Sequence, residues 1–360
     1  MKTRVRRILV QVGIFALAGV LLYLALRSVE FDKVGDALRE ADYRWIAPLA
    51  AITLLSHFLR AWRWKVLLEA LPSSSPEVDP RLVSIKTAFY SVMIGYMVNY
   101  AAPRLGEVAR TANLAAKERL SFSGVLGTVV VERILDLIML AVGLVGTFFL
   151  LIDHSAVLQA TFITPIQDWI EQIPLFTLLI LLLGVSILGV FLYWIGFRDE
   201  NARLRKFWDR RLRPLLTSFI DGLATVKRSP RPFFLIVSTL VMWFCYLMMA
   251  YIPLIMFDMA APYDLSLLDT VSIMFLGALG VAIPSPGGLG SYHYITIQVL
   301  GVLFGVDESI AATYAVFVHG GQMVFYIIIG FLCFLLQGSS FADLRSATKA
   351  ARHTTHDTKP

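Results

Sequence analysis

The chain has little charge and almost no cysteine. Only 16% of its 360 residues are Asp, Glu, Lys or Arg, whereas 57% are hydrophobic, which is more apolar side chain than one soluble core buries. Its two cysteines, Cys245 and Cys333, both lie in apolar runs and match neither a metal motif nor a disulfide framework. No basic patch with interleaved aromatic residues accompanies the net charge of +6. These absences exclude an ordinary soluble domain, a disulfide scaffold and a nucleic-acid partner.

Long apolar runs dominate what is present. Most of them approach or exceed the roughly 20 residues that a membrane-spanning helix needs. Lys and Arg gather in segments that stay inside, and the segments that lack them lie outside. This count places both termini in the cytoplasm and predicts an all-α polytopic membrane protein whose first run is a retained anchor. The apolar runs are residues 8–26, 45–59, 82–102, 121–152, 174–197, 233–257, 265–283 and 309–337.

Two of these regions must begin and end on the same side of the membrane. The charge count places both ends of residues 82–119 inside and both ends of residues 265–304 outside, which a single span cannot satisfy. Each region contains a helix break, at Pro103 in the first and at "PSPGG" from Pro284 in the second. Proline ends one helix and fits the first turn of the next. The sequence therefore predicts two broken re-entrant helical hairpins.

The hairpins divide the chain into halves of opposite orientation, which predicts an inverted repeat. An ungapped match that sets Ser123 over Ser309 also sets Arg133 over His319 and Asp136 over Gln322. Inverted repeats with broken helices are typical of transporters with a site near the midplane. The alternative is that these are ordinary Gly and Pro kinks. The predicted divisions are a first half (1–152, with a long charged helix at 121–152), a second half (153–337, with a basic amphipathic loop at 198–232) and a polar tail (338–360).

Three charges interrupt the run at 121–152: Glu132, Arg133 and Asp136. A charge at mid-helix costs about 2.5–3.5 kcal/mol on insertion scales, so these side chains are expected to face a polar interior. Glu132 and Asp136 would repel each other unless a cation lies between them, and the candidate cations are Arg133 itself and Arg104 or Arg110 from the first hairpin. The same residues are the candidates for binding a lipid head group. The alternative is an ion-pair knot that only locks helices together.

The hairpin tips supply a second polar feature. Helix N-termini at the tips, with Arg104 in the first turn, would make a cradle for a phosphate. Arg60 and Arg63, beside Trp62 and Trp64, are secondary candidates because an interfacial belt with snorkelling cations explains them more simply. No metal ligands and no cofactor are predicted. The further candidates are the tip residues Pro103, Pro284, Pro286, Gly287, Gly288 and Gly290, the neighbouring Tyr292 and His293, and the secondary residues His319 and Gln322.

The segments "RAWRWKVLL", "GYMVNYAAPRLGEVARTANL", "VVVERILDLIML" and "PSPGGLGSYHY", in this order, resemble the flippase-like membrane domain of the lysylphosphatidylglycerol synthase family. The resemblance covers about residues 8–337. It implies a bacterial inner-membrane protein that moves a lipid with a charged or glycosylated head group between leaflets, and it adds Gly106 and Glu107 to the candidates. Full-length synthases continue into a soluble aminoacyl-transfer domain. Because this chain ends after a polar tail, we do not expect it to aminoacylate a lipid.

The expected function is therefore transport, not catalysis. The cargo would be an anionic phospholipid or a polyprenyl-phosphate-linked lipid, bound by its head group. One alternative is a membrane enzyme that modifies lipids or glycolipids, with Glu107, Glu132 or Asp136 as base. Another is an accessory or structural subunit. Membrane lipids are the expected partners, and a homo-oligomer or a separate lipid-modifying enzyme stays open.

Overall fold

A computed structural model describes residues 16, 19–71, 79–101, 105–151, 183–184, 186, 229, 231–283 and 286–338. The chain divides into two compact units, one formed by residues 1–152 with 225–360 and the other by residues 153–224. Almost all of the second unit and most of the basic segment 198–232 lie outside the described residues, as do Pro103, Arg104 and Pro284. The description below concerns the first unit.

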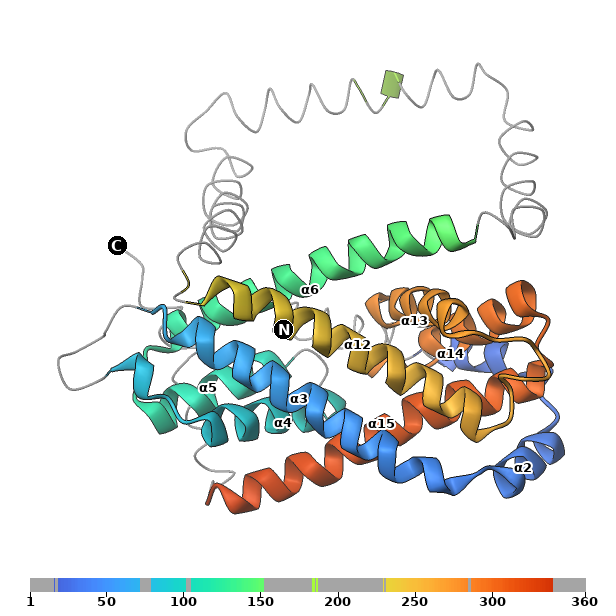
Figure 1. Cartoon of the computed structure of the whole chain (residues 1–360), viewed down its shortest axis with the longest axis horizontal. Helices are drawn as coiled ribbons and strands as arrows, with labels where there is room; N and C mark the ends of the chain where they lie inside the picture. The colour runs from blue at the N-terminus through green and yellow to red at the C-terminus, as the bar shows by residue number, and fades with distance from the viewer. Residues whose placement is uncertain are drawn as a thin grey trace, which may run out of the picture. The chain divides into compact units, whose positions relative to one another are not determined.

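The described part of this unit is built from helices, and no strand occurs in it. Three helices are long and apolar enough to cross a membrane: α3 with its preceding turn, α12 and α15. An all-helical membrane protein is thus confirmed. The helices, drawn in Figure 1, are α2 (Phe31–Glu40), α3 (Ile46–Leu68), α4 (Ile85–Ala101), α5 (Gly106–Glu118), α6 (Phe122–Leu150), α12 (Pro232–Met256), α13 (Leu267–Ala282), α14 (Ser291–Gln298) and α15 (Glu308–Leu336).

The first predicted break separates α4 from α5, which pack against each other. Gly106, the first residue of α5, makes this close packing possible. A Cβ added there would lie 2.2 Å from the carbonyl oxygen of Gly95, so no larger residue fits. The Gly106 amide donates to the side chain of Asn99 on α4 at 2.7 Å, which satisfies one of the unpaired amides of a helix start.

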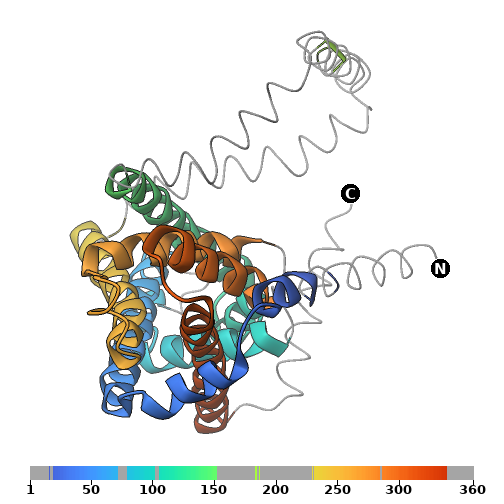
Figure 2. The same cartoon turned by 90° about the vertical axis from the view of Figure 1, so that its right-hand side faces the viewer.

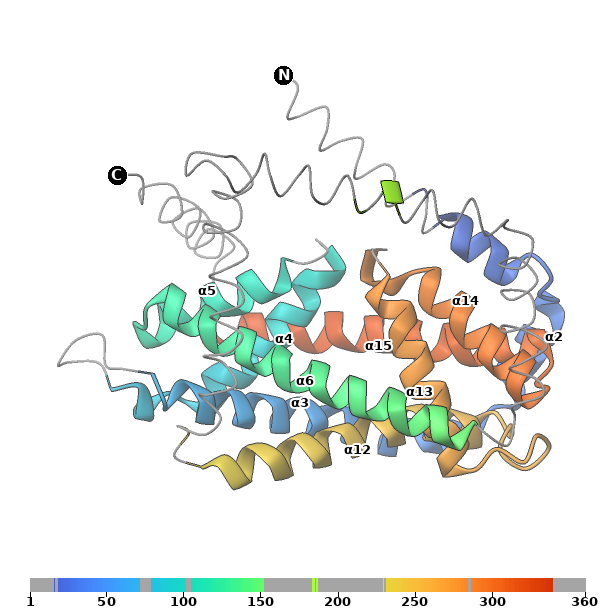
Figure 3. The ribbon, with the colours of Figure 1, turned by 90° about the horizontal axis from the view of Figure 1, so that it is seen from above.

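The second break separates α13 from α14 and contains a short turn at Pro286–Gly288. Gly287, Gly288 and Gly290 have φ values of 60°, 79° and 80°, a left-handed region that glycine enters without steric strain. Seen from above, the α4–α5 pair and the α13–α14 pair lie end to end, with α15 packed along both (Figure 3). The two breaks approach each other, because a Cβ on Gly287 would lie 3.4 Å from the ring of Tyr100 near the end of α4.

Helices α6 and α15 each contact helices on both sides of the two breaks. Helix α6 contacts its own hairpin helix α5 and also α13 of the other hairpin, while α15 contacts α14 and α4. Helices α3 and α12 lie side by side (Figure 2). Helices α6 and α15 each contain 29 residues, and the match of Ser123 with Ser309 aligns both of their ends. The side chains of Ser121 and Asp307 cap the two helices at equivalent positions.

Glycine also permits the close crossings of these long helices. A Cβ on Gly143 of α6 would lie 1.9 Å from the ring of Phe275 on α13. A Cβ on Gly330 of α15 would lie 2.6 Å from the backbone oxygen of Met93 on α4. A glycine of α6 therefore permits its close approach to α13, and a glycine of α15 permits its close approach to α4.

Candidate functional site

An arginine of α3 bridges the two intramembrane carboxylates of α6. Arg60 donates through Nη1 to Glu132, and its Nη2 lies 3.0 Å from Asp136 Oδ2. The same Nη2 lies 3.0 Å from the hydroxyl of Tyr246 on α12. The Arg60 side chain is 5% exposed, so the cation sits between the carboxylates and away from lipid.

Arg63, one turn further along α3, completes this contact. Its Nη2 lies 2.7 Å from Asp136 Oδ1 and 3.6 Å from Glu132 Oε1. Its Nη1 donates to Thr239 of α12 at 3.0 Å. Residues three or four apart share a helix face, which is why both arginines meet both carboxylates. Arg63 and Glu132 are fully buried, and such charges are tolerated only when paired and hydrogen-bonded.

The first hairpin contributes a third arginine. Arg110 of α5 lies 3.1 Å from Glu132 Oε2 through Nη1, and its guanidinium stands 5.0 Å from the ring centroid of Trp64. Its Nε and Nη2 are buried without a hydrogen-bond partner among the described residues. A buried donor left unpaired is unfavourable, so Arg110 keeps donor capacity that an anionic ligand would satisfy.

Arg133 has a different partner from the other arginines. It donates to Glu107 of α5, and its side chain is 47% exposed against 28% for Glu107. The pair borders a small pocket of about 10 Å³ between α4, α5 and α6, which Tyr96, Asn99 and Arg110 also line. Among the cluster's arginines, Arg133 therefore offers the most accessible cation.

The described cluster carries an excess of positive charge. It contains four arginines, Arg60, Arg63, Arg110 and Arg133, and three carboxylates, Glu107, Glu132 and Asp136. One cation therefore has no carboxylate of its own within the described residues. Arginine is well suited to a phosphate because its planar fork binds two oxygens at once. The arrangement favours an anionic ligand near Arg133 and Arg110.

Arg133 was one of the candidate cations for the two carboxylates, and it is not the one that lies between them. Arg133 does not neutralise Glu132 and Asp136, because Arg60 and Arg63 do so together with Arg110. The interfacial-belt interpretation of Arg60, Arg63 and Trp64 also fails, since all three are buried. The reason is that α3 continues from the apolar run to Leu68, so these residues lie inside the helix bundle. The expected approach of Arg110 is confirmed.

Trp64 is a further residue of α3 whose polar group lies inside the helix bundle. Its ring is fully buried, and its Nε1 donates to Thr128 of α6 at 2.9 Å. Trp62, two residues earlier, is 39% exposed and packs against Phe234 of α12. The side of α3 that carries Trp64 therefore faces the cluster, and the side that carries Trp62 faces the outer surface.

The second hairpin brings its candidate residues against α15. Tyr292 stacks on His319 at 5.0 Å between ring centroids, and His293 lies 5.2 Å from His319. His293 and His319 are buried, and each has one ring nitrogen without a hydrogen-bond partner among the described residues. The ring of Tyr100, from α4, lies 6.5 Å from the ring of His319. The two breaks thus share one polar region.

A row of rings joins this region to the ionic cluster. Tyr326 lies 6.3 Å from Tyr100, 4.9 Å from Tyr96 and 4.9 Å from His57. His57 is one turn before Arg60 on α3, and Tyr96 lines the pocket beside Arg133. His57, Tyr96, Tyr246 and Tyr326 were not predicted from the sequence. The signal that could have found His57 is its spacing of three from Arg60, which places both on one helix face.

Other candidates lie elsewhere or carry no contact to the cluster. Gln322 lines an apolar pocket between α3, α12 and α15. Gly290 precedes α14 at its start. Among the described residues, no group of three or more His, Cys, Asp or Glu side chains is placed to hold a metal ion.

Comparison with known proteins identifies the family of the chain. The family model of the lysylphosphatidylglycerol synthase TM region matches residues 8–330. A UPF0104 membrane protein of Methanocaldococcus jannaschii is 28% identical over 243 residues, which cover 64% of this chain and 94% of that protein. No solved structure matches the chain. The chain belongs to the lysylphosphatidylglycerol synthase TM region family.

Proposed function

We propose that this chain is a flippase-like lipid transporter and not an enzyme. The cargo is an anionic phospholipid or a polyprenyl-phosphate-linked lipid, whose phosphate binds between Arg133 and Arg110. The observation that carries the proposal is a cluster that, among the described residues, has one arginine in excess; Arg133 is half exposed there, and two nitrogens of Arg110 have no hydrogen-bond partner among these residues. A purely structural knot would pair every charge and leave none open to a ligand.

The proposal includes an inverted repeat with two re-entrant hairpins. Its support is the equal length and aligned ends of α6 and α15, together with their matching contacts to the hairpins. In such a repeat the breaks meet near the midplane, and rocking of one half against the other exposes the site alternately to each leaflet. The ring row between His57 and His293 then lines the route of the polar head group.

The same proposal places the protein in a bacterial inner membrane with both termini in the cytoplasm. A cysteine introduced at Lys117 should then react only with reagent added from the cytoplasmic side. Cysteines at Ala101 and Ser285, at the two breaks, should react poorly from either side. Labelling of the Lys117 position from outside would remove the re-entrant first hairpin, and the inverted repeat with it.

Lipid movement tests the role of Arg133. The double variant Glu107→Gln with Arg133→Gln removes one opposite-charge pair without changing net charge. It leaves intact the ion pairs that Glu132 and Asp136 form with the other arginines. We expect it to fold and to move a labelled anionic lipid between liposome leaflets about ten to a hundred times more slowly, because a charged hydrogen bond is lost. Arg133→Lys should keep part of the rate through its charge.

The matched control is Lys65→Gln with Glu69→Gln, another charge-neutral removal of a pair, which lies at 2.9 Å near the end of α3. It should leave lipid movement unchanged. Wild-type movement by the folded Glu107→Gln, Arg133→Gln variant would refute the phosphate role. A new lipid product that requires an activated donor would favour the enzyme, and no movement of any lipid by the wild-type protein would favour an accessory role.

A further inference from the structure

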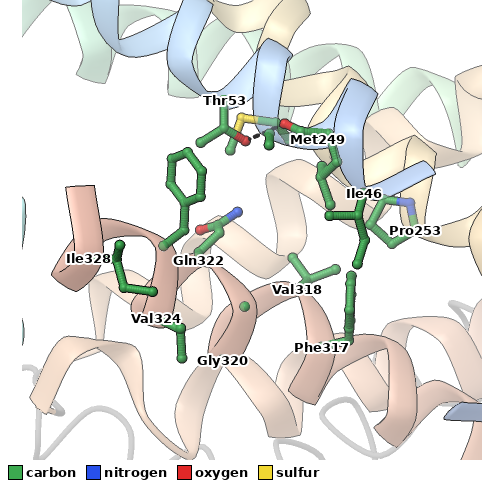
Figure 4. Close-up of a pocket in the computed structure, with 14 residues that line it drawn as sticks. Ile46, Thr53, Met249, Pro253, Phe317, Val318, Gly320, Gln322, Val324 and Ile328 are labelled. Carbon is green, nitrogen blue, oxygen red and sulfur yellow. Dashed lines mark hydrogen bonds between the residues drawn. The ribbon is translucent and has the colours of Figure 1, made fainter. Parts of the chain in front are cut away.

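A large apolar pocket lies apart from the charges, between α3, α12 and α15. Its volume is about 420 Å³, and fourteen residues line it (Figure 4). None of them is charged, and only Thr53 and Gln322 carry a polar side-chain group other than sulfur. The Thr53 hydroxyl already donates to the carbonyl of Leu49 at 2.7 Å. Such a lining does not hold water, whereas an apolar cavity of about 150 Å³ already takes up a benzene molecule.

We infer that this pocket holds one hydrocarbon chain of a membrane lipid. The inference deepens the proposed function and rests on it, since the same lipid would place its phosphate at Arg133 and Arg110. Two features beyond apolarity support this occupant: the pocket's position relative to the cluster, and the glycines that keep it open.

The pocket and the ionic cluster share one seam between α3 and α12. Thr53 of the pocket and Arg60 of the cluster are seven residues apart on α3, which places them on nearly the same face at about 10 Å along the axis. On α12, Met249 of the pocket follows Tyr246, the partner of Arg60, by one turn. A lipid therefore reaches the pocket with a chain while its head group lies at the cluster.

Two consecutive glycines of α15 form part of the pocket wall. A Cβ added to Gly320 or to Gly321 would meet no atom within 4 Å, so neither glycine is required by close packing. Glycine in a helix interior is destabilising relative to alanine. Their effect is to leave the space beside α15 unfilled. The amide of Gln322, which points toward the pocket interior in Figure 4, provides a donor for an ester oxygen at the start of the chain.

The test uses the full-length protein in detergent and a phosphatidylglycerol that carries a diazirine near the end of one acyl chain. In the wild-type protein, crosslinks should map to residues 46–53, 249–253 and 317–328. Gly320→Leu should fill the pocket without a clash. A leucine side chain displaces about four carbons of the lipid chain, and at roughly fourfold per methylene the apparent affinity should fall about 250-fold. Gly321→Leu is a second filling variant.

Gly146→Leu on α6 is the matched control, because its added Cβ also meets nothing within 4 Å and Gly146 does not line the pocket. It should crosslink like the wild type. Crosslinks outside the pocket in the wild type would overturn the inference, and so would unchanged affinity of a folded Gly320→Leu protein. If the chain's own segment 8–26 fills the space and pocket crosslinks are therefore absent, the inference of a lipid chain is overturned as well.

The outcomes separate this inference from the proposed function. Pocket crosslinks together with normal lipid movement by Glu107→Gln, Arg133→Gln would refute the head-group role and leave the chain site standing. Loss of movement in that double variant without pocket crosslinks in the wild type would refute the chain site alone.

Discussion

Replacement of Asp136 by asparagine should destabilise the protein more than the similar size and shape of the two side chains suggest. Asp136 and Glu132 are the two carboxylates that serve Arg60, Arg63 and Arg110. Asp136→Asn leaves three buried cations with one carboxylate. Removal of one partner from a buried ion pair typically lowers the free energy of unfolding by about 3–5 kcal/mol, because the other charge is left uncompensated. The 2.7 Å contact of Asp136 with the fully buried Arg63 places this site in that range.

The double variant Asp136→Asn with Arg63→Gln should recover part of the loss. It removes one charge of each sign, and the two amides can still hydrogen-bond to each other. Directly contacting residues commonly show coupling of about 0.5–3 kcal/mol, and we expect the upper part of that range for a pair with one member fully buried. The free energies of unfolding of the four proteins, measured by reversible steric trapping in bicelles, give the coupling.

The control cycle uses Asp36 and Arg39 of α2, whose 3.4 Å pair has side chains 65% and 84% exposed. It should show little coupling, because exposed ion pairs are screened by solvent. Additive losses in the Asp136 and Arg63 cycle would refute a direct contact between them. An undiminished stability of Asp136→Asn alone would refute a buried ionic cluster.

Two further predictions test packing in α3 and α6, with the apparent melting temperature in detergent as the readout. Gly143→Val should lower the free energy of unfolding by about 1–3 kcal/mol or more, because its Cβ would lie 1.9 Å from Phe275. The control Gly146→Val, with open space around its Cβ, should leave the stability nearly unchanged. Equal melting temperatures of the two variants would contradict the close crossing of α6 and α13. Trp64→Phe should cost about 1 kcal/mol through loss of the 2.9 Å hydrogen bond to Thr128, and a neutral result would place the indole nitrogen elsewhere.

Local sequence signals were sufficient for the two breaks and for the ends of α4, α13, α6 and α15. Proline and glycine mark the breaks, since they restrict or free the backbone at their own positions, and α4 ends at Ala101 while α13 ends at Ala282 as those signals predict. The match of Ser123 with Ser309 anticipates the aligned ends of α6 and α15, because capping residues act within one turn. Apolar runs of this length also determine the solvent, which is a bilayer.

The partners of the buried charges required the tertiary structure. Within the sequence, Arg133 is the cation nearest to Glu132 and Asp136, yet Arg133 pairs with Glu107 while Arg60, more than 70 positions away in the chain, bridges the two carboxylates. The apolar run ends at residue 59, which placed Arg60 and Arg63 at the membrane interface, whereas α3 continues to Leu68 and buries both. A helix face is fixed by spacing along one helix, but the identity of the helix that it meets depends on how all of them pack. Ion pairing in a low-dielectric interior depends on distance in space, so only the packing of α3, α5 and α6 decided which arginine neutralises which carboxylate.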